Sequence, residues 1–387
     1  MQVAFPGWLQ ILRNDSGCTL YDEALRRSQP VDPALASLLE QLREPIELAR
    51  LSAPEEANLS EVLLQQLLRS GCLVRAGDGP ALPHLLRSFL PTFLSCPSGS
   101  LACRASVLGV PCESQSVSGP GQAEGPASIR IASEFAEFTV NAEGKALGFF
   151  DYAANRQILE GVSICDIGNI IMEKGEPAER PGERLSQAIF SCRQAGSFPL
   201  ILGGDHSLTH AAVRGLNVPQ IHILHIDAHS DIMDADPALL PSSGSVVRSL
   251  LGEEWVAGVV SVGLRGVMQV RQQPVNGRHH MVPQSVYRTM PPEAIADMLG
   301  DPCYISLDID VLDPGTAPAV NLPVPAGMSM DEVWTLLRTV GAKRKVIGAD
   351  IVELIPRHDQ NFRTARLAAE LAIRLLSSVF DTGEAHG

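Results

Sequence analysis

The sequence predicts an α/β protein in which helices cover both faces of a parallel sheet. From Ser106 onward, short apolar runs alternate with amphipathic segments, which is the pattern of buried parallel strands joined by helices. The chain has 387 residues, of which 45% are hydrophobic and 19% charged, and this composition supports a large core. His and Asp residues follow directly after several apolar runs, at the strand ends where such sheets bind ligands.

The short apolar runs of this region are expected to be the strands. They are Ser106–Val110, Val162–Ile167, Phe198–Leu202, Gln220–Ile226, Val259–Gly263, Cys303–Leu307 and Val346–Ile351. Segments with apolar residues at helical spacing are expected to be the helices that cover the sheet. They are Arg184–Ala195, His210–Gly215, Pro292–Leu299, Met330–Val340 and Thr364–Ser378.

Residues 1–103 are expected to form a separate, small and mainly helical domain. Asp32 can cap a first helix, and Asn58 with Glu61 three residues later can cap a second. A short strand near residues 72–74 would follow, which is the order of elements in a winged-helix module. The favoured alternative is a helical cap or an oligomerisation element, because apolar faces at helical spacing are mostly core.

The stretch between about Pro97 and Gly125 is rich in Gly, Ser and Pro, and it is expected to separate the two domains. The second domain is then residues 104–387. The first hundred residues carry no cluster of residues typical of catalysis, so the chemistry is expected in the second domain.

The composition excludes several classes of function. Lys and Arg total 30 and Asp and Glu total 44, so the net charge is −14. Because Lys and Arg supply most of the affinity for nucleic acids, a small cationic substrate is expected instead of a nucleic-acid partner. No apolar run is long enough to span a membrane. The eight cysteines form no C-x-x-C pair, and without a signal-peptide pattern they indicate reduced thiols in a cytoplasmic protein.

Three short segments carry the residues that predict the chemistry. They are GGDHS (203–207), DAHSD (227–231) and DID (308–310), and each directly follows an expected strand. Residues two apart in an extended chain point the same way, so their His and Asp side chains can face one point. The candidate metal ligands are His206, Asp227, His229, Asp231, Asp308 and Asp310.

Two divalent cations would account for this set of imidazoles and carboxylates. Four carboxylates packed together repel one another, and most would have to take up protons. Two cations balance this charge, and a carboxylate-rich set suits Mn²⁺ better than Zn²⁺. A lone Asp-x-Asp or His-x-Asp is usually structural, but three such segments at strand ends favour a site for two Mn²⁺ per subunit.

With these segments the chain resembles the ureohydrolases, the superfamily of arginase, agmatinase and formimidoylglutamase. The segments GGDHS (203–207), DAHSD (227–231) and SLDIDVLDP (306–314) resemble its three signatures. Further similarity lies at residues 108–111, 125–130, 166–169, 350–353 and 364–368. The resemblance implies a three-layer α/β/α sandwich with a mostly parallel sheet, assembled as a homo-oligomeric trimer or hexamer. The first hundred residues have no counterpart in it.

The resemblance also implies a place for each ligand at two manganese ions. One ion would have His206 and Asp231, the other His229 and Asp310, and the bridging carboxylates would be Asp227 and Asp308. Hydroxide supplied by the two cations would attack the planar carbon of a guanidino or formimino group and release urea or formamide.

Two further roles follow from the same resemblance. Asp231 would relay a proton to the leaving nitrogen. Glu353 would pair with the guanidinium, because a planar cation with paired N–H donors is best oriented by a carboxylate. The alternative is that Glu353 is only a surface acid at the end of a strand. The residues around it also resemble the family, which favours the functional role.

Two departures from the family pattern bear on the substrate. Arginases and agmatinases carry a proton-shuttling His followed by Gly, where this chain has Ser243 and Gly244, as formimidoylglutamases do. Ser243 is the candidate catalytic residue at that place, yet serine is no acid or base at neutral pH, and His279 or His280 is a weak substitute. Residues 318–323 (PAVNLP) replace the family's Thr-Gly-Thr-Pro. Free arginine is therefore not the first choice of substrate.

Three functions remain open. The first is a manganese amidinohydrolase of the agmatinase or formimidoylglutamase type, acting on a small guanidino or formimino compound. The second is an arginase that acts on arginine side chains within a peptide, which the N-terminal domain would hold. The third is a metal-binding homologue without turnover, which the missing histidine supports and the complete ligand set opposes.

Overall fold

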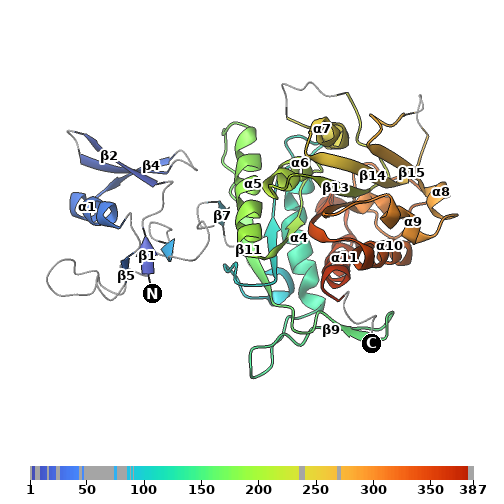
Figure 1. Cartoon of the computed structure of the whole chain (residues 1–387), viewed down its shortest axis with the longest axis horizontal. Coiled ribbons are helices and arrows are strands. Elements are labelled where there is room, and N and C mark those ends of the chain that lie inside the picture. Colours follow the sequence, from blue (N-terminus) through green and yellow to red (C-terminus); the bar gives the residue numbers. More distant parts are fainter. Residues whose placement is uncertain are drawn as a thin grey trace. The chain divides into compact units, whose positions relative to one another are not determined.

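The computed structural model describes residues 2–4, 9–14, 17–22, 27–42, 46–47, 74–75, 85–87, 89, 91–234, 240–267 and 272–381. The chain divides into two compact units, Met1–Arg87 and Ser88–Gly387. Figure 1 shows the elements of both units in order along the chain.

The described part of Met1–Arg87 consists of short strands and one helix. One antiparallel sheet contains, in order, β2 (Leu9–Asn14), β3 (Gly17–Asp22) and β4 (Arg27–Val31). A second contains β5 (Ile46–Glu47), β1 (Gln2–Ala4) and β6 (Val74–Arg75), and β7 (Leu86–Arg87) ends the unit. The described residues of this unit are thus mostly strands, whereas most of the segment expected to hold further helices lies outside the described residues.

The expected first helix of this unit is present. It is α1 (Pro33–Gln41), and the Asp32 side chain caps it by accepting hydrogen bonds from the backbone of Ala34 and Leu35. The helix expected from Asn58 lies outside the described residues. The strands were missed because their apolar alternation is short: in β3, Cys18 and Leu20 are buried and Thr19 between them is partly exposed.

Eight strands of Ser88–Gly387 lie in one sheet, and every neighbouring pair among them is parallel. Their order is β15 (His279–Pro283), β14 (Val256–Leu264), β13 (Ile221–Ile226), β16 (Cys303–Asp308), β17 (Val346–Val352), β12 (Phe198–Leu202), β8 (Ala105–Gly109) and β11 (Ile164–Ile170). All the strands expected from the sequence are present, and β15 is additional. The residues of β8, β12 and β16 are buried throughout, as expected of strands covered on both faces.

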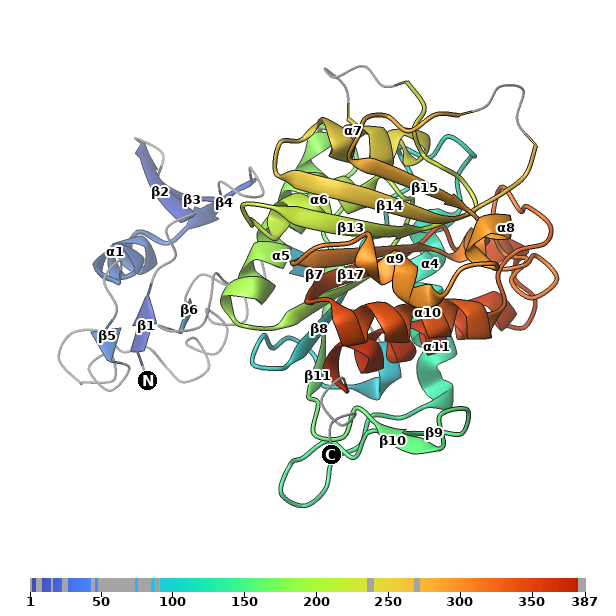
Figure 2. The same ribbon diagram turned by 45° about the vertical axis from the view of Figure 1, so that its right-hand side comes forward.

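Helices form a layer on each side of this sheet, which confirms the three-layer α/β/α fold (Figure 2). One layer contains α5 (Glu179–Gln194), α6 (Leu208–Gly215) and α7 (Val246–Gly252). The other contains α4 (Gly125–Ala132), α9 (Pro292–Asp297), α10 (Met330–Lys343) and α11 (Arg363–Phe380). The short α8 (Gln284–Tyr287) follows β15, and the hairpin β9 (Phe149–Asp151) and β10 (Arg156–Ile158) forms a separate sheet.

A buried ion pair ties the start of this unit to its sheet. Arg130 Nε lies 2.6 Å from Asp166 Oδ2, and neither side chain is exposed to solvent. Arg130 also donates to Asn169 Oδ1 at 2.5 Å, and Asp166 accepts from the Phe93 backbone N–H at 2.8 Å. Phe93 is itself fully buried. The unit therefore includes residues from Ser88 onward, which lie before the expected domain boundary.

Neither a membrane span nor a disulfide is found in the part of the chain that the structure describes. No helix there is both long and apolar enough to cross a bilayer. The cysteines described there are all free and buried, and Cys72 lies outside that part.

Candidate metal centre

The expected ligands come together at the carboxyl end of the parallel strands. The segment GGDHS follows β12, DAHSD follows β13, and Asp308 is the last residue of β16. A pocket of about 340 Å³ is lined by most of these ligands together with Glu353 and Ser243. Asp227 is fully buried beneath this pocket and contacts the ligands that line it.

One group of ligands surrounds His206. Its Nδ1 atom lies 3.1 Å from Asp227 Oδ2, 3.1 Å from Asp231 Oδ2 and 3.4 Å from Asp308 Oδ2. Among the described residues, neither His206 Nδ1 nor Asp227 Oδ2 has a hydrogen-bond partner, although both are buried. Buried polar atoms that face one another without a shared proton fit a cation between them.

The opposite edge of the His206 ring is fixed by residues that the sequence analysis did not assign. His206 Nε2 lies 2.8 Å from Ser306 Oγ, and the Ser306 hydroxyl donates to Asp350 Oδ1 at 2.7 Å. Asp350 also accepts hydrogen bonds from Thr209 and Tyr304, both at 2.8 Å. Because the hydroxyl hydrogen of Ser306 is used on Asp350, His206 donates from Nε2, and its Nδ1 is the ring atom that faces the carboxylates.

A second group of ligands surrounds His229. Its Nδ1 atom lies 2.9 Å from Asp310 Oδ2 and 3.6 Å from Asp227 Oδ1. Asp227 therefore faces His206 with one carboxylate oxygen and His229 with the other. This is the geometry required of a carboxylate that bridges two ions.

The carboxylates perturb one another strongly. Burial raises the pKa of Asp308 well above its usual range, and the charges of Asp310 and Asp227 raise it further. The pKa of Asp310 is also raised, by burial and by Asp227. Burial alone would raise the pKa of Asp227 as well, but His225 and the neighbouring imidazoles hold it well below its usual range. These carboxylates can all be ionised together when cations balance them.

Glu353 lies at the same pocket and already holds two hydrogen bonds. Oε1 accepts from the His206 backbone N–H at 2.8 Å, and Oε2 accepts from Gln122 Nε2 at 2.9 Å. Burial raises its pKa to about 7. Its φ of 66° and the φ of 50° at Asp231 place both residues in the left-handed region, which is uncommon for residues other than glycine.

Ser243 also lines the pocket, and its contacts are structural. Its hydroxyl accepts from the Val117 backbone N–H at 3.1 Å, and its own N–H donates to the Gln115 carbonyl at 3.0 Å. Neither His279, which is buried in the sheet, nor His280, which is exposed, is among the described residues that line this pocket. These contacts provide no acid or base in place of Ser243.

Sequence reasoning missed one histidine at this site. His225 is the residue before the end of β13, and its Nε2 lies 2.9 Å from Asp227 Oδ2 and 3.7 Å from Asp231 Oδ2. It is buried beside His206, with ring centroids 5.1 Å apart. The spacing contained the signal, because a residue two before Asp227 in an extended strand points to the same side.

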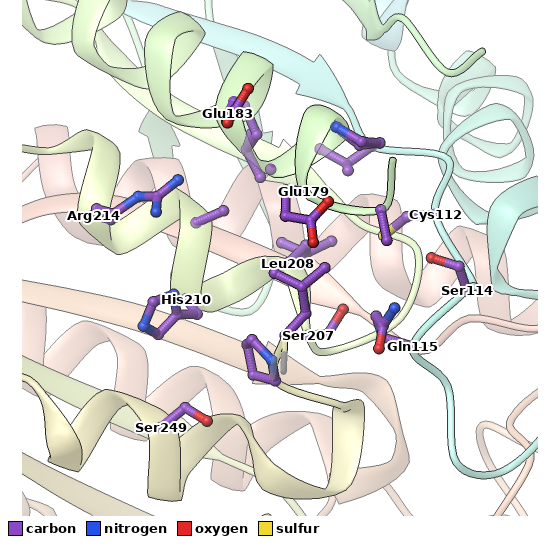
Figure 3. Close-up of a pocket in the computed structure, with 18 of the residues that line it drawn as sticks. Cys112, Ser114, Gln115, Glu179, Glu183, Ser207, Leu208, His210, Arg214 and Ser249 are labelled. Carbon is purple, nitrogen blue, oxygen red and sulfur yellow. The ribbon is translucent and has the colours of Figure 1, made fainter. Parts of the chain in front are cut away.

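A second cavity, of about 740 Å³, lies among α5, α6 and α7 (Figure 3). Glu183 from α5, His210 and Arg214 from α6, and Ser249 from α7 line it. None of the expected metal ligands is among the described residues that line it, and His210 is engaged with Glu253 at 3.0 Å. The candidate metal ligands therefore belong to the smaller pocket.

Comparison with known proteins identifies relatives of the region that carries this site. The Arginase family matches residues 103–377. Guanidino acid hydrolase, mitochondrial, of Homo sapiens is 29% identical over 287 residues, which cover 71% of this chain and 78% of the relative. Formimidoylglutamase of Ralstonia nicotianae is 30% identical over 262 residues, which cover 60% of this chain and 78% of the relative.

A solved structure agrees with these matches. Proclavaminate amidino hydrolase from Streptomyces clavuligerus superposes with a TM-score of 0.64 at 27% identity, covering 76% of this chain and 98% of that one. The family match extends over most of Ser88–Gly387, the unit that contains the sheet and the ligands. The chain therefore belongs to the arginase family of hydrolases, as its three motifs predicted.

Proposed function

We propose that this protein is a binuclear manganese amidinohydrolase that cleaves a carbon–nitrogen bond of a guanidino or formimino group and releases urea or formamide. The observation that carries this proposal is the convergence of unpartnered His206 Nδ1 with three carboxylates, beside a second His–Asp group that shares Asp227. The names of the relatives agree with it, because they include an agmatinase, a guanidino acid hydrolase and a formimidoylglutamase.

The residues present suit two Mn²⁺ ions. His206 and Asp231 would hold one and His229 and Asp310 the other, and Asp227 with Asp308 would complete both. Four carboxylates with two imidazoles form a donor set that suits Mn²⁺, whereas closed zinc sites are built mainly from Cys and His. Two bound cations would supply hydroxide near neutral pH and would polarise the substrate.

The protein side chains would orient the substrate and move its protons. Glu353 faces the pocket with a carboxylate already fixed by His206 N–H and Gln122, so it can accept two N–H groups of a guanidinium without rearranging. Asp231, with its Oδ2 beside His206, is placed to carry a proton to the leaving nitrogen. Both groups lie in one pocket, so they can act on one bound substrate.

The mouth of this pocket suits an aliphatic chain attached to the amidine. Val117, Met233 and Leu322 line the pocket, and each is about half exposed. Such side chains would pack against the methylene groups of a small guanidino compound.

We further propose that the protein works in the cytoplasm. We also propose that it forms a homo-oligomer, either a trimer or a hexamer. Light scattering of the purified protein gives its molar mass and so tests the oligomeric state.

Metal loading and a substrate screen test the proposal. Protein reconstituted with Mn²⁺ is analysed for bound metal and assayed with agmatine, guanidinobutyrate, formiminoglutamate, arginine and arginyl peptides for urea or formamide. We expect two equivalents of metal and turnover of at least one substrate. Asp227→Ala should lose both, whereas Asp234→Ala, which removes a fully exposed carboxylate nearby, should keep both. Two bound metals without any turnover would support the homologue without activity.

A further inference from the structure

A buried glutamine lies against Glu353, on the loop that leads from β8 to α4. Gln122 begins the helical turn Gln122–Glu124, and it is fully buried. Its Nε2 atom lies 2.9 Å from Glu353 Oε2 and 2.7 Å from Ser116 Oγ. Neither Gln122 nor Ser116 is among the described residues that line the pocket of the metal centre. Gln122 is therefore placed to act on a bound substrate through Glu353.

The orientation of the Gln122 amide is set by Ser116. The Ser116 hydroxyl donates to the Gly119 carbonyl oxygen at 2.9 Å, so its single hydrogen is used there. Ser116 Oγ is then the acceptor in its contact with Gln122, which turns the amide nitrogen toward it. The contact of 3.2 Å with Ser118 Oγ is compatible with this, because a hydroxyl oxygen has two lone pairs. The second hydrogen of the Gln122 nitrogen is donated to Glu353.

The backbone on both sides of Gln122 is held by one carboxylate. Glu113 Oε2 accepts from the Gly121 N–H at 2.7 Å and from the Ala123 N–H at 3.3 Å. Asn321 Nδ2 ties the same loop by donating to the Gly119 carbonyl at 2.9 Å. The glutamine is thus held in place before a substrate binds, so its contact with Glu353 is preorganised.

This arrangement leaves Gln122 with an unsatisfied atom. Among the described residues, Gln122 Oε1 has no hydrogen-bond partner, although it is buried. A buried polar atom without a partner lowers stability, and such an atom calls for an explanation. A methionine has a similar shape and no such atom, so core packing alone does not account for a glutamine here. The hydrogen bond that it donates to Glu353 does.

We propose that Gln122 is a positioning residue that aims the Glu353 carboxylate at the N–H groups of a bound substrate. The inference rests on the proposed function, because it takes Glu353 as the partner of the guanidinium. Glu353 Oε1 is bonded by the His206 N–H and Oε2 by Gln122, so each oxygen keeps a lone pair for one N–H of a planar cation. Without Gln122, the described residues would hold the carboxylate at one oxygen only, and it could turn about its last bond.

Steady-state kinetics of matched variants test this inference. Gln122→Met removes the donor with little change of shape and should lower kcat/KM by about 10-fold, the equivalent of one hydrogen bond. Ser116→Ala removes the group that orients Gln122 and should lower kcat/KM by a smaller factor. Gln284→Met makes the same change at another buried glutamine, which is not among the described residues that line the pocket, and should match the parent protein. Metal analysis should find two Mn²⁺ in each variant, and circular dichroism checks their folding.

A double-mutant cycle separates positioning from a general structural role. In a Glu353→Ala background there is no carboxylate to aim, so Gln122→Met should change kcat/KM by less than about 2-fold. A structural role would instead lower kcat/KM by the same factor in both backgrounds. That result, or parent-like kcat/KM in Gln122→Met, would overturn the proposal.

The same cycle remains decisive if the proposed function is wrong. If the parent protein binds two metals but cleaves no amidine, the proposed function fails, and the cycle is then read from calorimetric titration of the Mn²⁺-loaded proteins with agmatine. Gln122→Met should weaken agmatine binding in the parent background and leave it unchanged in Glu353→Ala. A parent protein that neither cleaves an amidine nor binds agmatine would refute this inference as well.

Discussion

The buried ion pair between Arg130 and Asp166 should stabilise Ser88–Gly387 strongly, and a double-mutant cycle can measure its contribution. Arg130 Nε and Nη2 donate to the two Asp166 oxygens at 2.6 Å and 2.9 Å, and neither side chain is exposed. Asp166 also accepts from the backbone N–H groups of Phe93, at 2.8 Å, and Gly168, at 2.9 Å. The perturbations are Arg130→Met, Asp166→Leu and the two together.

The magnitudes follow from what each change leaves in the core. Each single variant leaves a buried charge without its partner, which costs about 3–5 kcal/mol. The double variant leaves no charge, but Phe93 and Gly168 lose their acceptor, at about 1–3 kcal/mol for each unpaired group. We therefore expect the double variant to lose about 4 kcal/mol less than the sum of the single losses.

Urea unfolding followed by tryptophan fluorescence provides the free energies. A Trp8→Phe background is used so that Trp255 and Trp334 report on Ser88–Gly387 alone. Losses that simply add to within about 0.5 kcal/mol would show that the two residues are not coupled, and the reasoning would be refuted.

Two further predictions concern the site. Glu353→Gln should keep both metals and lower kcat/KM by about 10- to 150-fold, the equivalent of a charge-assisted hydrogen bond worth about 1.5–3 kcal/mol. Steady-state kinetics with metal analysis measures this, and loss of metal would assign Glu353 to the metal centre instead. Gly204→Ala should destabilise the protein by about 1–3 kcal/mol and weaken metal binding, because the new Cβ would lie 1.9 Å from the Cys112 carbonyl oxygen. Gly252→Ala, where nothing lies within 4 Å, is its control in thermal melts, and equal behaviour of the two would contradict the argument.

Much of the fold could be predicted because its strands are short apolar runs with clear ends. β12 (Phe198–Leu202) has the predicted bounds, and other expected strands differ by a few residues. β15 was missed because His279 and His280 make its sequence polar, although one of them is buried against β14. A buried histidine cannot be told from an exposed one by composition, since its burial depends on a partner in another strand.

The site could be predicted as far as its residues follow strands at regular spacing. Asp227 and His229 stand out because they follow an apolar run, whereas His225 lies inside that run and reads as part of the strand. The roles of Ser306 and Asp350 depend on a contact between residues that are 44 positions apart in the sequence. The Ser306 hydroxyl donates to Asp350 Oδ1 at 2.7 Å. Such contacts arise from the packing of neighbouring strands, which spacing along one segment does not determine.

The anchoring of Phe93 has a practical consequence for anyone who shortens this chain. A fragment cut to the start of the family match at residue 103 would remove an aromatic side chain from the core and a hydrogen-bond donor from the Asp166 carboxylate. Such a fragment would have a cavity in its core where Phe93 packs. If it failed to express, that result would not show that the first domain is needed for folding. A cut at the boundary between the two compact units, before Ser88, would keep Phe93 and its hydrogen bond to Asp166 in the fragment.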